Sequence, residues 1–465
     1  MSKRFSLNKP VIYFLGHMFL VAWTQLLYSS SVLLLPPGPQ LSLAITHLFS
    51  SIFAGCLGLA VALLAYKVTP LQQRREMLHL MGIIGAVATC GIPFVSCGLI
   101  DSWWVVVCVS LAAAAGTWLS VAWFERFAAQ GVRGAFICYA LTSLLGSLLC
   151  LLISLCPQPA GIVCTVLLPF CATFSLQVFR SPVSDQPESS AVNAAPTAER
   201  FSYRQLLART PMRLILVAGI ISFSLGAIRT LQLPVDPAMP PVGEWAFSLV
   251  TYTVALAIAG IFAFLSYRLN QTIAFYIAIP LIALAAILLA TSTAGPGLAN
   301  SSLIYIGTSL ITIMVWLLLV DTVAIRGVPA AWCFGMLSAI QFAGTFIGQV
   351  FIVLAGDNRL LLAMVVLVVL LLAALAVIGE RRVVSELSGQ SRIEARASRL
   401  CDSANLSPRE REVFMIWASG HNSAYIEQSL NISKNTVKTH LAHIYSKTKT
   451  TNREELLVLL DEIEL

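Results

Sequence analysis

Hydrophobic positions follow two different patterns along this chain of 465 residues. Up to Gly379, apolar runs of about twenty residues alternate with short polar breaks, and residues 360–379 alone read LLLAMVVLVVLLLAALAVIG. A helix needs about 20 apolar residues to cross roughly 30 Å of hydrocarbon. The pattern therefore predicts an all-α fold, with a bundle of twelve membrane-spanning helices over residues 1–379.

Breaks containing proline, glycine or charge separate the predicted spans, as in PPGPQ and CPQPAG. The spans begin near Val11, Leu41, Met77, Trp103, Ala135, Ala160, Leu214, Trp245, Thr272, Leu303, Trp332 and Arg359. The longest break, residues 180–211, is rich in Ser, Pro and Ala and is too polar to be buried. We expect two halves of six helices, residues 11–180 and 211–379, joined by a cytoplasmic linker at 181–210.

Basic residues are distributed unequally between alternate loops. The N-terminus and the even-numbered loops carry fifteen Lys and Arg, whereas the odd-numbered loops offer only Arg229 and Arg359. Cytoplasmic loops retain basic residues, so this count places the N-terminus in the cytoplasm. With an even number of spans the C-terminus is cytoplasmic too, which predicts a multi-pass membrane protein with both termini in the cytoplasm.

Composition agrees with a membrane protein. The chain is 58% hydrophobic and 11% charged, with a mean hydropathy of +0.83, whereas soluble domains are about 45–50% apolar and about a quarter charged. The eleven cysteines lie almost wholly inside the apolar runs, where free cysteine packs as a small hydrophobe. Cys97 and Cys156 lie near the outer ends of their segments, which leaves a disulfide between them open.

The second pattern begins after Gly379. Residues 380–402 mix both charges with apolar residues at helical spacing. We expect a solvated juxtamembrane linker, with a single helix or a short two-chain coiled coil as alternatives. Residues 403–465 form a compact block with clear helix boundaries, which predicts a separate four-helix domain.

Capping residues mark the start of each helix in that block. The expected N-caps are Ser407, Asn422 or Ser423, Ser433 and Thr451. SPRE (407–410) is a capping box, in which Ser407 accepts from the N–H of Glu410 and Glu410 reaches back. A second box is expected between Thr451 and Glu454.

The third helix of the block has two distinct faces. At 100° per residue, Val437, Leu441 and Ile444 make one buried stripe. The polar side carries Asn435, Thr439, Ala442 and Ser446, flanked by Lys434, Lys438 and His443. Residues 431–453 hold five basic residues and no acid, although residues 403–465 hold seven basic and eight acidic residues. This arrangement predicts a helix-turn-helix whose third helix enters the major groove of double-stranded DNA.

These residues closely resemble the DNA-binding domain of LuxR-type transcription regulators over about sixty positions. The matching positions are Leu406, Arg409, Glu410, Val413, Gly420, Ile426, Leu430, Ile432, Ser433, Thr436, Val437, Lys438, His440, Ile444, Tyr445, Lys447 and Arg453. The resemblance implies that Lys438, Thr439 and Ala442 face bases. Lys434, Asn435, Thr436 and Lys447 suit phosphates, which position the domain without reading sequence. It also implies a homodimer through the last helix, 452–465.

Three positions depart from the family pattern. Ala442 is short where a longer polar side chain is common, which reduces direct readout there to contact with a thymine methyl group. Glu427 stands where a small residue usually lets two helices approach, and TKTT (448–451) replaces the usual Leu-Gly-Val turn. None of these changes the buried stripe.

The two sets of six spans resemble the major facilitator superfamily, which has two pseudo-symmetric bundles around a central site. The loop YKVTPLQQRREML (66–78) keeps the family's basic residues but lacks its Gly and Asp, which argues against ion-coupled transport.

A few polar residues lie within the predicted spans. Arg229 and Glu244, near the outer ends of spans seven and eight, are candidates to bind an anionic ligand, to pair with each other, or to anchor the helices at the membrane interface. Gln25, Gln177, Gln341 and Gln349 line a cavity or join helices, and GTFIG (344–348) is a small-residue packing motif.

Other chemistry has little support in the sequence. His440 and His443 are three apart, but no acidic or cysteine partner is near them in sequence, so we expect no metal site. The chain lacks H-E-x-x-H, a phosphate loop and G-x-S-x-G, so we expect that the protein binds no cofactor and is not an enzyme.

The sequence predicts a membrane-bound bacterial transcription regulator that binds double-stranded DNA and senses an unknown small-molecule effector within the bilayer. The alternative is a transporter with a regulatory DNA-binding tail.

Overall fold

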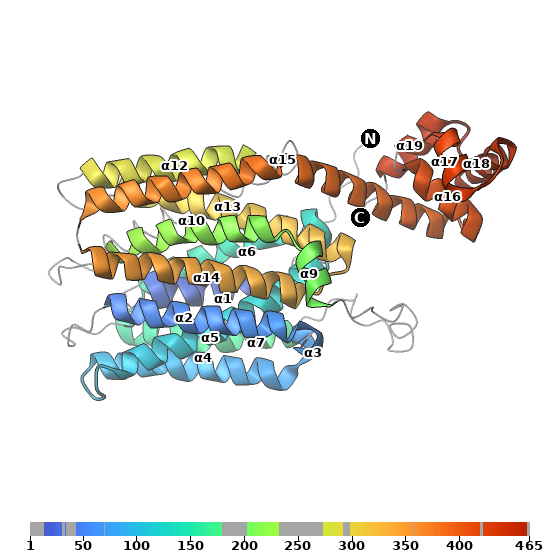
Figure 1. Cartoon of the computed structure of the whole chain (residues 1–465). Helices are drawn as coiled ribbons and strands as arrows, with labels where there is room; N and C mark the ends of the chain where they lie inside the picture. The colour runs from blue at the N-terminus through green and yellow to red at the C-terminus, as the bar shows by residue number, and fades with distance from the viewer. Residues whose placement is uncertain are drawn as a thin grey trace. The chain divides into compact units, whose positions relative to one another are not determined.

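The computed structural model describes residues 14–29, 33, 43–68, 70–178, 202–231, 273–291, 298–356, 358–418 and 422–462. Across these ranges every regular element is a helix (Figure 1). The chain divides into two units, one of Met1–Val323 with Val328–Ile378 and one of Gly379–Leu465 with Ala324–Gly327. We call them the membrane unit and the C-terminal unit.

Helices lie over eleven of the twelve predicted spans. In the first half they are α1 His17–Ser29, α2 Leu43–Leu63, α4 Arg75–Ser96, α5 Trp104–Ala128, α6 Gly131–Ser154 and α7 Gln158–Val178. In the second half they are α10 Met212–Leu231, α12 Ile273–Thr291, α13 Leu298–Arg326, α14 Ala330–Ala355 and the start of α15 Arg359–Ser403. The span expected near Trp245 lies outside the described residues.

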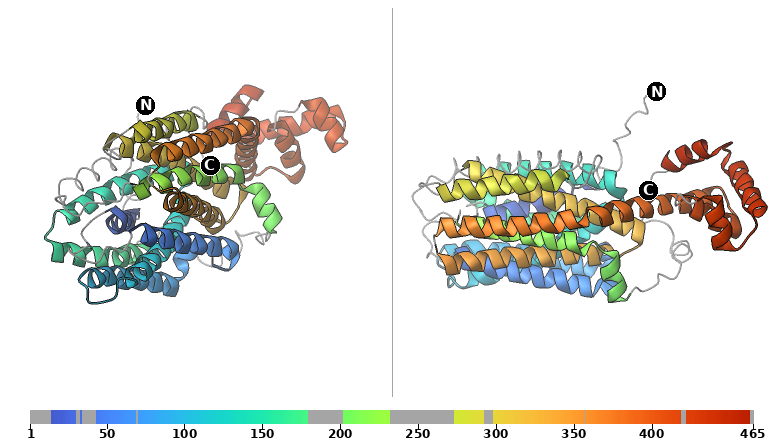
Figure 2. Two further views of the ribbon diagram at one scale, coloured as in Figure 1. Left: turned by 60° about the vertical axis from the view of Figure 1, so that its left-hand side comes forward. Right: turned by 45° about the horizontal axis from the view of Figure 1, so that its top comes forward.

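The apolar helices differ in length. Six described helices are long and apolar enough to cross a membrane, or seven if the bent pair of α9 (Tyr203–Arg209) and α10 counts as one span. Four more apolar helices are shorter, within α1, α12, α13 and α15. Figure 2 shows these helices running side by side in one bundle.

Helix α14 packs between α2 of the first half and α10 of the second. A Cβ atom added at Gly344 would overlap the carbonyl oxygen of Gly219, and one at Gly348 would overlap that of Phe223. On the side of α2, a Cβ added at Gly335 would lie 2.7 Å from the carbonyl oxygen of Gly58. The interpretation of GTFIG as a packing motif is confirmed, because only glycine permits these close approaches.

Glutamine side chains join helices in the membrane unit. Gln25 Nε2 donates to Ser147 Oγ at 2.9 Å, and Gln341 Nε2 donates to Thr312 Oγ1 at 3.1 Å. Gln349 Oε1 accepts from Ser51 Oγ at 3.1 Å and so links α14 to α2. Of the two roles expected for these glutamines, the structure shows helix joining for these three.

A cluster of aromatic side chains connects the two halves. The rings of Tyr139 on α6 and Trp316 on α13 stack with centroids 4.9 Å apart, and those of Phe124 on α5 and Phe334 on α14 lie 5.4 Å apart. The imidazole of His17 packs on the same cluster, 5.6 Å from the Tyr139 ring. Aromatic pairs at these separations stabilise the contact beyond their buried area.

Two further expectations concern the membrane unit. All eleven cysteines are free, so the disulfide left open between Cys97 and Cys156 is not formed. Arg229 lies in α10, two residues before its end, whereas Glu244 lies outside the described residues.

The C-terminal unit contains α16 Pro408–Ala418, α17 Ser423–Leu430, α18 Lys434–Thr448 and α19 Arg453–Glu462, packed around one hydrophobic core. The core includes Val413, Phe414, Trp417, Ile426, Val437, Ile444, Leu456 and Leu460. It also includes Ala397, Leu400 and Cys401 of α15, which lie N-terminal to the boundary expected at residue 403. Residues 380–402 are helical, and the apolar face of their last turns is buried because Ala397, Leu400 and Cys401 lie on one side of α15.

Candidate nucleic-acid interface

The capping box at the start of α16 is formed as expected. The backbone N–H of Ser407 donates to Glu410 Oε2 at 2.7 Å, and the N–H of Glu410 donates to Ser407 Oγ at 3.4 Å. Two N–H groups that would otherwise lack partners are thereby satisfied, which fixes where α16 begins. The glycine expected to end this helix, Gly420, lies outside the described residues.

A tight turn connects α17 to α18. Helix α17 begins after Asn422, whose Oδ1 accepts from the N–H of Tyr425 at 2.9 Å. It ends at Asn431, which adopts the left-handed conformation at φ 53° and donates its N–H to the carbonyl oxygen of Glu427. Asparagine tolerates this conformation better than most residues. Ser433 then caps α18 by accepting from the N–H of Thr436 at 3.2 Å, so the predicted helix-turn-helix is present.

Helix α18 has the two faces that its periodicity predicted. Val437 and Ile444 are fully buried in the core, and Leu441 packs against it partly exposed. All eight predicted DNA-contacting residues are exposed, namely Lys434, Asn435, Thr436, Lys438, Thr439, Ala442, His443 and Lys447. The hydroxyl of Thr439 donates to the carbonyl oxygen of Asn435 at 3.0 Å, so this side chain is held against its own helix.

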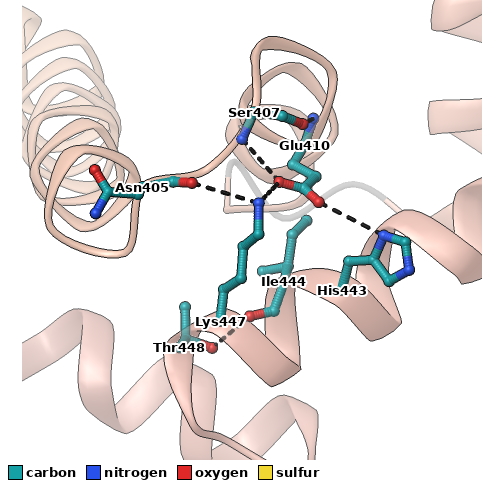
Figure 3. Close-up of polar contacts among 7 residues, drawn as sticks. All are labelled: Asn405, Ser407, Glu410, His443, Ile444, Lys447 and Thr448. Atoms are coloured by element: carbon teal, nitrogen blue, oxygen red, sulfur yellow. Dashed lines mark hydrogen bonds and ion pairs between the residues drawn. The ribbon is translucent and has the colours of Figure 1, made fainter.

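The carboxylate of Glu410 on α16 contacts two basic side chains near the end of α18 (Figure 3). Lys447 Nζ donates to Glu410 Oε2 at 2.6 Å, and His443 Nδ1 lies 3.6 Å from Oε1. Lys447 also donates to the carbonyl oxygen of Asn405 at 3.4 Å. The Glu410 side chain is only 6% exposed, so its charge has little water to stabilise it and depends on these partners.

The ionisation of Glu410 reflects this environment. The hydrogen bond from Lys447 lowers the pKa of Glu410 from 4.5 to about 2, and the bonds from Ser407 act in the same direction against the opposing effect of burial. Glu410 is therefore a carboxylate at neutral pH. The same carboxylate caps α16 and holds the side chain of Lys447 on α18.

This pairing divides the predicted DNA-contacting residues into two groups. Lys447 and His443 point at a carboxylate of their own domain, whereas the resemblance implied a phosphate contact for Lys447. Lys434 and Lys438 make no ion pair within the described part of the chain. Sequence reasoning missed this difference, although Glu410 had been identified as the reciprocal residue of the capping box.

Helix α19 is capped by Asn452 and not by Thr451, so its N-cap lies one residue later than expected. Asn452 Oδ1 accepts from the N–H of Glu455 at 2.9 Å, and Glu455 Oε2 accepts from both the N–H and the hydroxyl of Thr451, at 2.7 and 2.8 Å. The expected partner Glu454 is exposed. Asparagine is a stronger N-cap than threonine, which accounts for the shift.

The turn before α19 contains a left-handed residue. Lys449 is the C-cap of α18 with φ 56° and ψ 36°, at the position where the family pattern has glycine in its Leu-Gly-Val turn. The TKTT sequence thus keeps the backbone geometry at some conformational cost. On α19, Leu456 and Leu460 are buried while Leu457 and Val458 are exposed.

A second contact joins α15 to α16. Arg411 donates to Asp402 Oδ1 at 2.7 Å and to Ser398 Oγ at 2.6 Å. The sequence did not reveal this contact, because its three members lie in regions assigned to a linker and to a domain.

Comparison with known proteins agrees with this geometry. Residues 404–460 match the family described as bacterial regulatory proteins, luxR family. These residues form a LuxR-type domain. The putative HTH-type transcriptional regulator YhjB of Escherichia coli is 37% identical over 60 residues, and the monoamine regulon transcriptional regulator of Klebsiella aerogenes is 43% identical over 54 residues. The matches cover 13% and 12% of this chain and 30% and 24% of those proteins, so the likeness is confined to the LuxR-type domain.

The membrane unit is similar in fold to solved transporter structures. The Escherichia coli fucose:proton symporter aligns with a TM-score of 0.50 and 15% identity, over 78% of this chain and 97% of its own. A bacterial homologue of the iron transporter ferroportin, in its outward-facing state, aligns with a TM-score of 0.52 and 15% identity, over 79% and 97%. At this identity the likeness shows the fold alone, which is major-facilitator-like. Together with the apolar helices it indicates a multi-pass membrane protein.

Within the described residues, no group of three or more His, Cys, Asp or Glu side chains is placed to hold a metal ion. His443 instead faces Glu410.

Proposed function

We propose that this protein is a membrane-bound transcription regulator whose LuxR-type domain binds double-stranded DNA through α18. The observation that carries the proposal is the exposed polar face of α18, with Lys434 and Lys438 unpaired among the described residues, in a chain that also contains a multi-span membrane unit. Cations on a helix that can enter the major groove supply both attraction to phosphate and contacts with base edges.

Within the site, different residues have different tasks. Lys438, Thr439 and Ala442 face the bases, and Ala442 offers its methyl group to thymine. Lys434, Asn435 and Thr436, at the start of α18, contact phosphates and set the register of the helix. We assign Lys447 and His443 to positioning α18 through Glu410, because their polar atoms face that carboxylate in the DNA-free chain.

The membrane unit is the proposed sensor. We propose that both termini are cytoplasmic in a bacterial inner membrane, as the basic loops favour. An unknown small-molecule effector, with Arg229 and Glu244 as candidate contacts, would act only through different affinities for two arrangements of the helix bundle. Two LuxR-type domains would pair through α19, where the exposed Leu457 and Val458 provide apolar surface.

A truncation tests the assignment of the DNA-binding site. The full chain and a chain ending at Gly379, both in lipid nanodiscs, are compared for binding to a fluorescent fragment of the promoter upstream of their own gene and to a scrambled fragment. We expect the full chain to prefer the promoter fragment and the truncated chain to bind neither. The cut after Gly379 removes residues 380–465, which include the LuxR-type domain and the α15 residues of its core. Equal binding by the two chains would contradict the proposal.

A transporter with a regulatory DNA-binding tail is the alternative, and the major-facilitator-like fold supports it. Proteoliposomes separate the two functions. A sensor binds its effector without sustained net flux, whereas a transporter equilibrates the solute across the bilayer. Sustained flux of the effector, abolished by a variant that no longer binds it, would favour transport.

A further inference from the structure

Helix α9, Tyr203–Arg209, was not expected from the sequence, which assigned residues 181–210 to a polar linker. The signal that locates it is the capping box of Ser202 and Gln205, in which each side chain accepts from the other's backbone N–H, at 3.4 and 2.8 Å. The helix meets α10 at an angle of 76°. A helix that turns so sharply at the end of a span lies across the bundle end instead of continuing through it.

Two contacts fix α9 to the ends of other helices. Trp332 at the start of α14 donates its Nε1–H to Thr210 Oγ1 at 3.0 Å. Tyr203 donates its hydroxyl to the carbonyl oxygen of Leu63, the last residue of α2, at 2.9 Å. Leu206 is buried and packs the helix against the bundle. Figures 1 and 2 show α9 at one end of the bundle, and Figure 1 shows α3, Ala65–Val68, at the same end.

The outer surface at this place combines apolar and basic side chains. Leu63, Leu64, Tyr203 and Leu207 are 47%, 45%, 56% and 43% exposed. Lys67 on α3 and Arg204 on α9 are also exposed, and neither side chain makes a hydrogen bond or ion pair with another residue of the described ranges. Residues 41–75 and 201–235 contain no Asp or Glu, so no acid on these segments neutralises the two cations.

The order of these side chains fits the border between hydrocarbon and headgroups. Leucines at the end of α2 suit acyl chains, tyrosine is enriched at membrane interfaces, and long basic side chains extend from that level to charged headgroups. Lys67 follows Leu63 by four residues, beyond the end of the apolar helix.

We propose that α9, the end of α2 and α3 form a binding surface for the headgroup of an anionic phospholipid, held by Lys67 and Arg204 with its acyl chains against Leu63, Leu64 and Leu207. The charge of the surface selects the headgroup. The bond from Tyr203 to Leu63 keeps the two cationic segments together. Because α9 belongs to the connection between the two halves, a lipid bound there braces the start of α10 against α2.

Lipid-dependent thermal stability of the full chain tests the proposal. The purified protein in neutral detergent is titrated with phosphatidylglycerol, with phosphatidylcholine or with inorganic phosphate, and the unfolding midpoint is followed. We expect phosphatidylglycerol to raise the midpoint and the other two to leave it unchanged. Lys67→Gln and Arg204→Gln should each raise the half-saturating phosphatidylglycerol concentration about fivefold, because each basic residue near an anionic surface contributes about 1 kcal/mol.

Two variants serve as controls. Arg204→Lys keeps the charge and should bind like the wild type. Lys449→Gln removes an exposed cation of the LuxR-type domain and should also bind phosphatidylglycerol like the wild type. The proposal fails if the Lys67 and Arg204 variants bind phosphatidylglycerol like the wild type, or if phosphate or phosphatidylcholine stabilises equally. It also fails if the two cations prove to bind DNA, so that Lys67→Gln and Arg204→Gln weaken promoter binding and not lipid binding.

Discussion

Lys447 Nζ donates a hydrogen bond of 2.6 Å to Oε2 of Glu410, from the last turn of α18 to the first turn of α16. The two residues are 37 apart in the sequence. Through this bond the capping box that starts α16 also fixes the C-terminal half of the DNA-binding helix. The position of α18 therefore depends on a carboxylate that lies outside the helix-turn-helix itself.

Replacing Glu410 with Gln should destabilise the LuxR-type domain by about 2 kcal/mol. The change removes a charge-assisted hydrogen bond and weakens an N-cap, each of which contributes on the order of 1–2 kcal/mol. Lys447 is 39% exposed and can regain water, which limits the loss. Hydrogen exchange of α16 and α18 in the full chain measures the effect. Glu412→Gln, which breaks the exposed pair with Arg409, is the control and should cost less than 1 kcal/mol.

Acid should weaken the same domain through Glu410. Its pKa is lowered from 4.5 to about 2 in the folded chain, chiefly by Lys447. The unfolded state thus binds a proton more readily, so the stability contributed by Glu410 is fully present above about pH 4.5 and is lost as the pH falls toward 2. Pulse proteolysis with pepsin between pH 5 and pH 2 follows this loss. Glu410→Gln should show a shallower pH dependence, and an unchanged dependence would contradict the assignment.

Lys438→Ala should reduce promoter binding more than random-DNA binding. Lys438 is exposed on the polar face of α18, where the LuxR-type resemblance places a base contact. Loss of a base contact costs about 1–3 kcal/mol of discrimination. Fluorescence anisotropy with promoter and scrambled fragments at one fixed salt concentration measures the difference. Equal weakening on both fragments would show that Lys438 contacts only phosphate.

Lys434 and Lys447 should differ in their salt dependence. Lys434→Ala removes a cation that is unpaired among the described residues, so the slope of log K against log salt should fall by about 1. Lys447→Ala removes a cation already paired with Glu410, so its slope should stay near the wild-type value while the domain becomes less stable. If Lys447→Ala lowers the slope as much as Lys434→Ala, then Lys447 leaves Glu410 to bind phosphate.

Lys449→Gly should stabilise the domain by about 0.5–1 kcal/mol. Lys449 adopts φ 56° at the end of α18, and its Cβ is unfavourable in that conformation, whereas glycine has none. Hydrogen exchange of α18 and α19, measured at increasing temperature, reports the gain in the free energy of unfolding. Lys449→Ala removes the same charge but keeps a Cβ, so it should bring no comparable gain. A gain from both variants would assign the effect to charge.

The sequence predicted the local features of the LuxR-type domain well. The apolar period of α18 identified Val437 and Ile444 as core, and the caps Ser407 and Ser433 follow from residue preferences that act within one turn. Apolar runs likewise located helices over eleven of the twelve predicted spans, and six or seven of these described helices have the length and apolar character that a bilayer requires.

Features that depend on tertiary packing were harder to predict. Lys447 is basic and lies near the polar face of α18, and only the packing of α16 on α18 shows that Glu410 holds it. The burial of Leu400 depends in the same way on which face of α15 meets the core. At α19, Thr451 and Asn452 are adjacent and both can cap a helix, and the structure shows Asn452 as the N-cap.

The burial of α15 in the core limits how this protein can be regulated. Ala397, Leu400 and Cys401 are core residues, and Ile393 packs against them, so a cleavage product that keeps the whole core has to begin before Ile393. A protease acting between the membrane and this core would have to cut within residues 380–392, and those residues are helical. Proteases cut chains that are locally unfolded, so release would first require this helix to melt. An intact α15 therefore favours signalling by a regulator that stays attached to its membrane while it binds DNA.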